Sequence, residues 1–332
     1  QSIKYFYCSE KLSMSENSDL AVHNSTGEYI CFIGDDDGVS RNIIDCVKWM
    51  KRNGFDSLRS SRVDYNWGDY NKSKHSKDMS QTLLYNQFSL TYKFVDAKKE
   101  LNRILRKGLQ TVDEIPMLYN SIVRKDVLNE IYNIGNTFFP GASPDISNGI
   151  ALCFYVKKYV VIDLPVVISG ASMMTGGGIY KRKGRTSRLE DVGFISKNVI
   201  DNWEENIPRI WAGRLAWPES GVKALRYLGK EDYLKYMNYN YMFAAFSVYY
   251  SQFFRTAFEY SPNKLLFLFY LLVILFSSGT RVLKNKIVSL LSQGHAYGKI
   301  IEHEIKDINE AEQYIHNIIG ENCFEKLKLI MH

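Results

Sequence analysis

The chain has 332 residues, of which 45% are hydrophobic and 23% are charged. These proportions are typical of a globular protein and exclude a disordered or collagen-like chain. The formal net charge of +6 is too small to indicate nucleic-acid binding. Five cysteines without a CxxC pair argue against a disulfide framework and a cysteine zinc site, and they favour a reducing compartment.

The first part of the chain predicts alternating strands and helices. We expect strands at 1–7 and 29–33, and helices at 16–26 and 40–53. The run 29–33 is wholly apolar, which is typical of a strand buried on both faces of a parallel sheet. The second helix has Ser40 as its predicted N-cap and ends at Gly54. Its predicted apolar face consists of Ile43, Ile44, Val47 and Met50.

The pattern continues to about residue 190. The polar run 64–81 predicts a surface excursion. The elements expected after it are helices at 94–107, 125–134 and 146–155, strands at 117–123 and 160–169, a loop at 138–145, and a glycine-rich and then basic loop at 170–188. From residue 189 the pattern is mainly helical, and we place a domain boundary near residue 190. Together these elements predict an α/β fold.

Three consecutive carboxylates, Asp35, Asp36 and Asp37, follow the apolar run 29–33. Like charges this close repel each other unless a cation lies among them. Ligands bind at the carboxyl ends of strands in open α/β sheets, so we expect this loop to face such a crevice. Aspartate oxygens suit Mg²⁺ or Mn²⁺, and such an ion can bridge phosphate oxygens. The alternative is a solvated acidic turn.

Two further blocks follow the acidic loop in order: Pro116–Lys125 with Ser143-Pro144-Asp145, and Ile168–Ser172. Together with Asn17, Asn24 and the run Gly27–Asp37, they resemble family 2 glycosyltransferases over about residues 1–190. The resemblance implies a GT-A (Rossmann-like) fold, in which helices flank a mixed sheet, followed by a mainly helical region at 191–332. The family's opening strands, which hold the nucleobase and ribose, would lie upstream of Gln1. We therefore expect the given sequence to begin partway through the domain.

The resemblance also implies roles for individual residues. Asp145 would be the catalytic base, although a helix dipole would lower its pKa; alternatively, it is only a helix N-cap. Asp37 would hold a divalent metal, Mg²⁺ or Mn²⁺, which stabilises the departing diphosphate as a Lewis acid. Asp35 and Asp36 would contact the donor's ribose and sugar, or orient Asp37. Asn17 would contact the donor or serve as a helix-cap amide.

A basic stretch at 181–188 carries five positive charges in eight residues and follows the three glycines at 176–178. A glycine hinge followed by cations is typical of a lid that closes over a diphosphate. We therefore predict that Lys181 and Arg182 bind the donor. The alternatives are contact with anionic lipid headgroups and a basic loop without a ligand.

The run Leu265–Phe276 contains twelve apolar residues, inside an uncharged window of sixteen residues between Lys264 and Arg281. A membrane-spanning helix needs about 20 such residues, so this run is short. An aromatic-rich stretch at 233–260 precedes it, and basic residues follow it. We predict that 264–292 associates with a membrane surface or enters it without crossing. The alternatives are a buried helix or oligomer contact in a soluble helical domain, and a true span.

The leading hypothesis is a metal-dependent, inverting glycosyltransferase of the hexosyltransferase type. It would move a sugar from a nucleotide-diphosphate donor to a hydroxyl of a glycan or lipid-linked acceptor, in bacterial polysaccharide biosynthesis. We expect it to be cytoplasmic and peripheral at the inner face of the cell membrane. The alternative is a non-catalytic, glycosyltransferase-like scaffold in a polysaccharide assembly complex.

Overall fold

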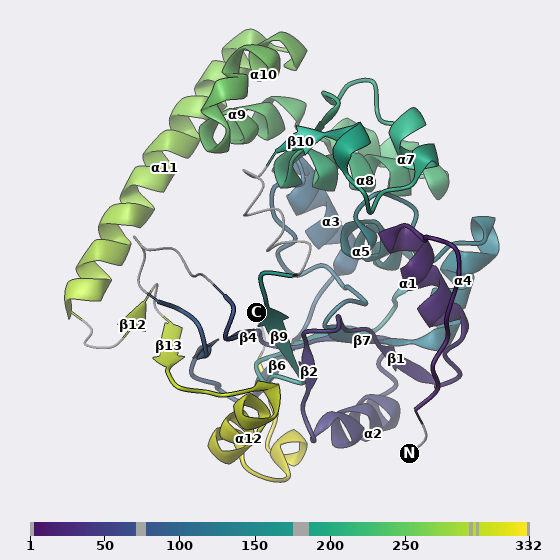
Figure 1. Ribbon diagram of the computed structural model, residues 1–332, viewed down its shortest axis with the longest axis vertical. Helices are drawn as coiled ribbons and strands as arrows, with labels where there is room; N and C mark the ends of the chain where they lie inside the picture. The colour runs from purple at the N-terminus through teal and green to yellow at the C-terminus, as the bar shows by residue number, and fades with distance from the viewer. Residues whose placement is uncertain (1–2, 71–77, 175–185, 292–294, 297–298, 331–332) are drawn as a thin grey trace.

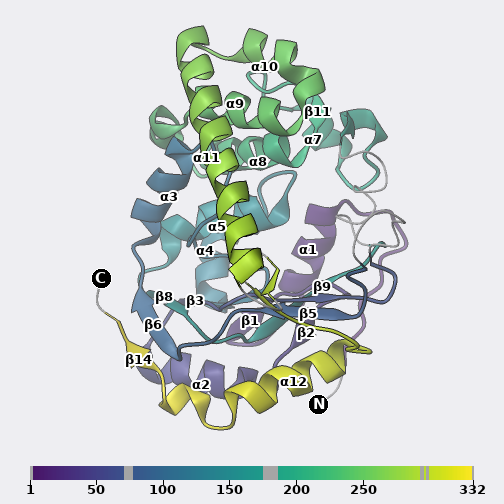
Figure 2. The same cartoon turned by 90° about the vertical axis from the view of Figure 1, so that its left-hand side faces the viewer.

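The computed structural model describes residues 3–70, 78–174, 186–291, 295–296 and 299–330. Two sheets lie side by side at its centre, with helices above and below them (Figure 1). A further group of helices lies beyond the upper layer, and the long helix α11 runs down one side of the molecule (Figure 1), which faces the viewer in Figure 2. The predicted α/β class and the mainly helical region after residue 190 are confirmed.

The first sheet has six strands in the order β1-β7-β3-β8-β6-β14. Their bounds are β1 Tyr29–Cys31, β3 Ser57–Arg59, β6 Thr91–Phe94, β7 Ser121–Arg124, β8 Tyr159–Ile162 and β14 Lys328–Leu329. The sheet is mixed, because β3 pairs parallel with β8 and antiparallel with β7. At its far edge β14 pairs parallel with β6, so the end of the chain returns to this sheet.

The second sheet has the order β12-β13-β5-β4-β9-β2. Its bounds are β2 Gly38–Val39, β4 Val63–Asn66, β5 Thr82–Tyr85, β9 Val167–Ala171, β12 His295–Ala296 and β13 Lys299–Glu302. The central pair β4 and β9 is parallel, and β2 closes one edge against β9. A separate two-stranded sheet joins β10 Ser187–Arg188 to β11 Ile210–Trp211.

The helices form layers around these sheets. Their bounds are α1 Met14–His23, α2 Ile43–Asn53, α3 Ala97–Arg106, α4 Lys125–Gly135, α5 Pro144–Tyr155, α7 Lys197–Asp201, α8 Gly213–Tyr227, α9 Tyr239–Tyr249, α10 Phe254–Tyr260, α11 Lys264–Leu291 and α12 Ile308–Ile319. Short 3₁₀ helices lie at η1 Leu189–Asp191, η2 Glu231–Tyr236, η3 Ser251–Phe253 and η4 Cys323–Glu325. In both views α2 and α12 cover the lower side of the sheets, and α1, α4 and α5 cover the upper side (Figures 1 and 2).

Three apolar clusters hold the layers together. One joins α2 and α12 to the sheets through residues such as Met50 and Ile315. A second joins α1 and α4 to β1 and β7, with Leu128 at its centre. The third joins α5 to α3, α8, α9 and α11. Because α5 belongs to both of the last two clusters, it connects the sheet region to the helical region.

The opening strand prediction is wrong for residues 3–7, which are exposed and have no regular structure; residues 1–2 lie outside the described part. The prediction for 29–33 is correct as a strand but wrong in its environment. The strand β1 is an edge strand that pairs antiparallel with β7, and Tyr29 and Cys31 are partly exposed. An apolar run indicates burial, but it does not determine the direction of the neighbouring strand.

The helix predicted from Ser40 begins later, at Ile43, with Asn42 as its N-cap residue. The Ser40 hydroxyl instead accepts the Asn42 backbone N–H over 3.2 Å. Of the predicted apolar face, Met50 is fully buried, Ile43 and Val47 pack partly buried against the same cluster, and Ile44 is exposed. The buried residues are Cys46, Trp49 and Met50. The predicted end is confirmed, since Gly54 has a left-handed φ of 65°.

Two further predictions need correction, the surface excursion at 64–81 and the single strand at 160–169. Part of the predicted surface excursion is β4, where Tyr65 is fully buried and its hydroxyl donates to the Ile305 carbonyl. The predicted single strand at 160–169 is two strands, β8 and β9, which belong to different sheets. Pro165 lies between them, where a proline cannot donate to a strand ladder. The helices predicted at 94–107, 125–134 and 146–155 are confirmed with bounds shifted by up to three residues.

The last part of the chain contributes to both sheets through β12, β13 and β14, while the division at residue 190 stays a prediction. Among the helices that the structure describes, none combines enough length with enough apolar character to cross a bilayer.

Candidate active site

The acidic loop lies where the two sheets meet, because β1 belongs to one sheet and β2 to the other. The Asp37 side chain is buried and accepts three hydrogen bonds. Its Oδ2 accepts from the Gly34 N–H at 2.8 Å and from the Tyr119 hydroxyl at 2.7 Å. Its Oδ1 accepts from the Gly170 N–H at 2.7 Å. Asp37 therefore ties its own loop to β9 and to the segment before β7.

Strand β9 approaches this loop very closely at Gly170. A Cβ at that position would lie 1.7 Å from the Asp36 carbonyl oxygen, so only glycine fits. From the other side, Trp67 Nε1 donates to the same carbonyl over 2.9 Å. The backbone of Asp36 is thus fixed between the ends of β9 and β4.

Asp36 receives fewer side-chain hydrogen bonds than Asp37, although part of its carboxyl group is buried. Burial and the neighbouring Asp37 charge raise its pKa to about 6, although backbone N–H groups, including that of Ser172, oppose the shift. Its Oδ2 is buried and has no hydrogen-bond partner in the described part of the chain. Asp35, in contrast, is exposed. Asp36 therefore offers a carboxylate oxygen to a ligand or cation that this loop could bind.

The Tyr119 side chain connects the acidic loop to Asp145. Backbone pairing places Tyr119 beside the acidic loop, through a parallel bridge with Phe32. Burial raises the pKa of the Tyr119 hydroxyl, and so do its hydrogen bond to Asp37 and the charges of Asp37, Asp36 and Asp145. Asp37 accepts from this hydroxyl at 2.7 Å, and the Phe32 ring lies 5.8 Å from the ring of Phe139 in the loop that leads to Asp145. The two predicted parts of the site therefore lie in one region of the molecule.

Asp145 lies in the first turn of α5 and is partly exposed. Its Oδ1 accepts from the Ser143 hydroxyl at 2.6 Å and from the Ile146 N–H at 3.0 Å. The N-cap residue is Ser143, and Pro144 begins the helix, so the alternative that Asp145 is the N-cap is wrong. We expected a lowered pKa, but burial raises the pKa of Asp145 and outweighs the opposing hydrogen bonds.

Helix α1 fixes the loop that leads to Asp145. Asp19 accepts hydrogen bonds from the Thr137 hydroxyl at 2.6 Å and from the Phe138 N–H at 2.7 Å. The Ser15 hydroxyl donates to the Gly141 carbonyl at 2.8 Å. These contacts join residues more than 100 positions apart in the sequence, and they hold the loop against α1.

Helix α8 supports the same loop from the side of the helical region. The Ser143 N–H donates to the Ser220 hydroxyl at 2.8 Å, and this hydroxyl faces Glu219 Oε2 at 3.4 Å. Glu219 is almost fully buried, and burial raises its pKa to about 8. Its Oε1 has no hydrogen-bond partner within the described residues. A buried carboxyl group therefore lies behind the Asp145 loop.

The comparisons with known proteins agree with the first half of this site. The model of glycosyl transferase family 2 matches residues 1–131, which include Asp35–Asp37 and Tyr119. Residues 1–131 are therefore similar to glycosyl transferase family 2, and we call them the family 2 segment. The match ends before Asp145 and Gly170, whose positions next to the family 2 segment come from the structure.

Two solved structures show limited similarity to the chain. The structure of S. aureus TarS 1-349 in complex with UDP-GlcNAc is 16% identical, with a TM-score of 0.32, and the match covers 48% of this chain and 39% of that one. The structure of S. aureus TarS is also 16% identical, with a TM-score of 0.30, and the match covers 49% of this chain and 25% of that one. The matched part thus spans well under half of either TarS chain. No curated protein matches the chain.

A divalent ion is compatible with the carboxylates of the family 2 segment. The described residues contain no group of three or more His, Cys, Asp or Glu side chains placed to hold a metal. Mg²⁺, however, usually takes one or two protein carboxylates and completes its shell with water and substrate phosphates. Asp36 has an open carboxylate oxygen, and Asp37 beside it accepts three hydrogen bonds and keeps a free lone pair. These two residues are suitable ligands.

The remaining predicted site residues are less informative. Asn17 is exposed on α1. Lys181 and Arg182 lie outside the described residues, as do the glycines at 176–178. Sequence reasoning missed the contributions of Trp67, Tyr119 and Glu219. Tyr119 stood inside a block already singled out, whereas Trp67 was assigned to a surface excursion and Glu219 carried no local signal.

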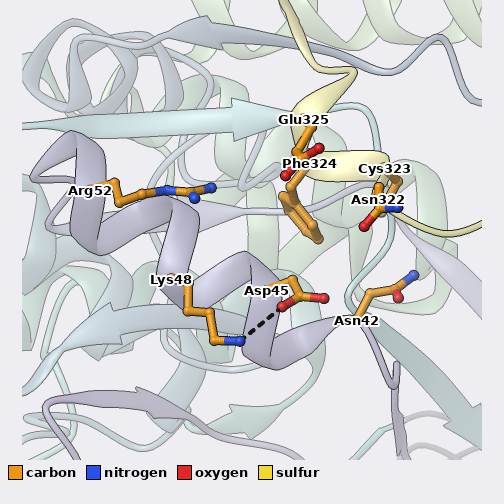
Figure 3. A pocket seen from close by; sticks show the side chains of 8 residues that line it. All are labelled: Asn42, Asp45, Lys48, Arg52, Asn322, Cys323, Phe324 and Glu325. Atoms are coloured by element: carbon orange, nitrogen blue, oxygen red, sulfur yellow. Dashed lines mark hydrogen bonds and ion pairs between the residues drawn. The ribbon is translucent and has the colours of Figure 1, made fainter.

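Two surface hollows lie elsewhere, and neither is lined by the predicted site carboxylates. The first, of about 240 Å³, lies between α2 and η4 (Figure 3). It is lined by Asn42, Asp45, Lys48, Arg52, Asn322, Cys323, Phe324 and Glu325. Within it Lys48 pairs with Asp45 at 3.3 Å. The second, of about 470 Å³, is lined by residues such as Phe94, Lys98 and Tyr159.

Proposed function

We propose that this chain transfers a sugar from a nucleotide-diphosphate donor to the hydroxyl group of a glycan or lipid-linked acceptor. The observation that carries the proposal is that the acidic loop lies next to the loop that leads to Asp145: Asp37 accepts from the Tyr119 hydroxyl at 2.7 Å, and the rings of Phe32 and Phe139 are 5.8 Å apart. A donor-side acidic loop and a second carboxylate near it are the two groups that such a transfer needs. The family 2 segment supports the same reaction class.

Asp145 is our candidate for the base that activates the acceptor hydroxyl. A base for this step must accept a proton near neutral pH, and the raised pKa of Asp145 makes it more basic than an ordinary aspartate. The hydrogen bonds from Ser143 and Ile146 both end on Oδ1, which leaves Oδ2 for the acceptor proton. These contacts also fix the direction in which the carboxylate points.

In the proposed step the acceptor oxygen forms a bond to the anomeric carbon while the bond from that carbon to the diphosphate breaks. The acceptor proton moves to Asp145, and the electron pair of the broken bond leaves with the diphosphate. A single displacement of this kind inverts the anomeric configuration. We propose that the Asp36 carboxylate, whose Oδ2 is buried without a partner in the described residues, and Asp37 hold Mg²⁺ or Mn²⁺, which would supply positive charge for the departing diphosphate. Asp35, Asn17, Lys181 and Arg182 remain our candidates for contacts to the donor.

The setting we propose is bacterial surface-polysaccharide biosynthesis at the cytoplasmic face of the cell membrane. The rival proposal is a scaffold that keeps the fold but transfers nothing. Calorimetry of the chain with Mn²⁺ and a panel of nucleotide-sugars separates the two. We expect heat from at least one donor, and no heat from any donor when Mn²⁺ is removed by a chelator. Silence across the whole panel would favour the scaffold.

The role of Asp145 has its own test. The Asp145→Asn variant should bind the donor with unchanged affinity, because Asp145 acts on the acceptor, and its turnover should fall at least about a hundredfold. In the wild-type protein the rate should rise with pH through the raised pKa of Asp145, since only the ionised carboxylate accepts a proton. Sugar transfer by Asp145→Asn at the wild-type rate would show that the base lies elsewhere.

A further inference from the structure

The outer face of helix α11 is apolar and exposed. We define this face as Leu265, Leu268, Phe269, Leu272, Leu275 and Phe276. The spacing of three and four residues places all six side chains on one side of the helix. Leu265, Leu272 and Phe276 are 79%, 68% and 76% exposed, which is far from ordinary for large apolar side chains that recur along one helix.

In the first half of α11, where the structure describes the side chains, the opposite face is packed, so the exposed side chains do not result from a loosely held helix. Phe267 is fully buried and contacts the rings of Phe254 and Phe258, with centroids 5.7 and 5.6 Å apart. Tyr270 packs edge-on against Tyr241 of α9 at 5.5 Å. Figure 2 shows α11 running along one side of the molecule, in front of the helical region. The helix is thus fixed in place with its apolar outer face turned away from the core.

The charged residues within α11 itself are of one sign. The sequence contains no Asp or Glu between Glu259 and Glu302, whereas Lys264 begins α11 and Arg281, Lys284 and Lys286 belong to its second half. Exposed aromatic side chains flank the helix at Tyr249, Phe254 and Tyr260. Aromatic rings and cations around an apolar helix face are typical of segments that lie in a bilayer interface.

We propose that the outer face of α11 docks on an anionic lipid surface, with the helix lying in the plane of the membrane. Apolar side chains enter the boundary between headgroups and acyl chains, and the net positive charge of the 264–291 segment favours a surface of anionic headgroups. This surface is independent of the sugar-transfer site, and it would bring the chain to membrane-bound acceptors.

A second copy of the chain fits the outer face less well. Two α11 helices packed face to face would bring together two segments that each carry four cations, and residues 260–301 contain no Asp or Glu to neutralise them. Like charges at an interface oppose association, whereas an anionic bilayer neutralises the same cations. The charge pattern therefore selects a lipid surface over a dimer.

Vesicle co-sedimentation of the full chain, without donor or metal, tests this proposal. Vesicles of phosphatidylcholine alone are compared with vesicles of equal parts phosphatidylcholine and phosphatidylglycerol. We expect binding to the anionic vesicles and much weaker binding to the neutral ones. The triple variant Leu268→Glu, Leu272→Glu, Phe276→Glu should lose roughly a hundredfold or more of that binding. Its matched control carries Ile44→Glu, Ile134→Glu and Ile318→Glu, three exposed apolar positions on other helices, and should bind as the wild type does.

A second pair of variants tests the charges. Neutralising Arg281, Lys284 and Lys286 to Gln should reduce binding to anionic vesicles by on the order of a hundredfold, since each cation contributes about 1 kcal/mol near such a surface. Neutralising Lys48, Lys51 and Arg52 on α2 should leave binding unchanged.

Sedimentation velocity measures the oligomeric state and so tests the alternative that the outer face of α11 binds a second copy of the chain. A wild-type dimer that the three glutamates on α11 convert to a monomer, together with no vesicle binding, would overturn the lipid proposal in favour of self-association. Equal binding to neutral and anionic vesicles would overturn its electrostatic part.

Discussion

The Tyr119 hydroxyl donates a hydrogen bond to Asp37 Oδ2 over 2.7 Å and thereby joins two segments 82 residues apart. The same oxygen accepts the Gly34 N–H, and the other oxygen of Asp37 accepts the Gly170 N–H. One buried carboxylate therefore holds together the acidic loop, strand β9 and the segment before β7. Whatever Asp37 does toward a metal, its position depends on these three donors.

The first prediction concerns the Tyr119→Phe variant. Removing one donor to a buried carboxylate should lower the free energy of unfolding by about 2 kcal/mol. Because the acidic loop then has one fixed contact less, metal-dependent donor binding should also weaken. Denaturant unfolding and donor titration measure the two effects.

The matched control for this variant is Tyr29→Phe, which removes a hydroxyl that donates to the Phe55 carbonyl at 3.1 Å. This variant should lose about 1 kcal/mol of stability and no donor affinity. If both Tyr→Phe variants bound the donor as the wild type does, Tyr119 would have no part in organising the site.

The second prediction concerns Gly170→Ala. The added methyl group would meet the Asp36 carbonyl at 1.7 Å, and backbone atoms cannot move aside as a flexible side chain can. Strand β9 and the acidic loop must therefore separate, which should lower the free energy of unfolding by about 3 kcal/mol or more and abolish donor binding. Gly213→Ala is the control, because nothing lies within 4 Å of a Cβ there. If the two variants unfolded at the same temperature, β9 could not lie as close to the Asp36 carbonyl as the structure shows.

Local patterns predicted most of the helices near the site, whereas strand partners depended on distant residues. Helix α5 was expected at 146–155 and begins two residues earlier, at Pro144, so Asp145 lies in its first turn and not at the end of the preceding loop. The edge position of β1 could not be predicted, because it depends on β7 about 90 residues later. The same reason hid Glu219, whose burial results from packing between α5 and α8. A single sequence specifies local periodicity, while these features are set by tertiary contacts.

The third prediction concerns Asp36→Asn. In the folded protein the pKa of Asp36 is about 6, so its charge opposes folding above that pH and the opposition disappears as the pH falls toward 4. The neutral asparagine should therefore stabilise the protein at pH 7, by at most about 1 kcal/mol after solvent screening, and have no effect at pH 4. Metal-dependent donor binding should nevertheless be lost.

Asp35→Asn is the control for this pair of effects, because Asp35 is exposed and the change in net charge is the same. Its unfolding free energy should stay within about 0.5 kcal/mol of the wild type at both pH values. In the wild-type protein, donor binding with Mn²⁺ should weaken below about pH 6, where Asp36 takes up a proton. A destabilised Asp36→Asn variant at pH 7 would mean that the Asp36 charge is compensated in the folded protein.

The fourth prediction concerns Glu219, the buried carboxyl group behind the Asp145 loop. Burial raises its pKa to about 8, so the folded protein keeps a proton that the unfolded chain releases above about pH 4.5. The free energy of unfolding is therefore unaffected by the Glu219 charge at low pH, and it falls as the pH rises from about 4.5 to about 8. Glu219→Gln should match the wild type at pH 4 and be more stable at pH 8. Unfolding titrations across this range measure the difference.

Glu312→Gln is the control with the opposite sign. Although burial raises the pKa of Glu312, its hydrogen bonds and ion pair with Arg41 lower it overall. The stability from Glu312 is present at neutral pH and is lost in acid, so Glu312→Gln should be less stable than the wild type at pH 8 and equal to it at low pH. Glu219 is connected to Asp145 only through Ser220 and Ser143. Because Glu219 is already neutral at neutral pH, Glu219→Gln should leave the charge behind the Asp145 loop unchanged and should keep sugar transfer. A stability loss in Glu219→Gln at pH 8 would show that the buried group is ionised and paired in the folded protein.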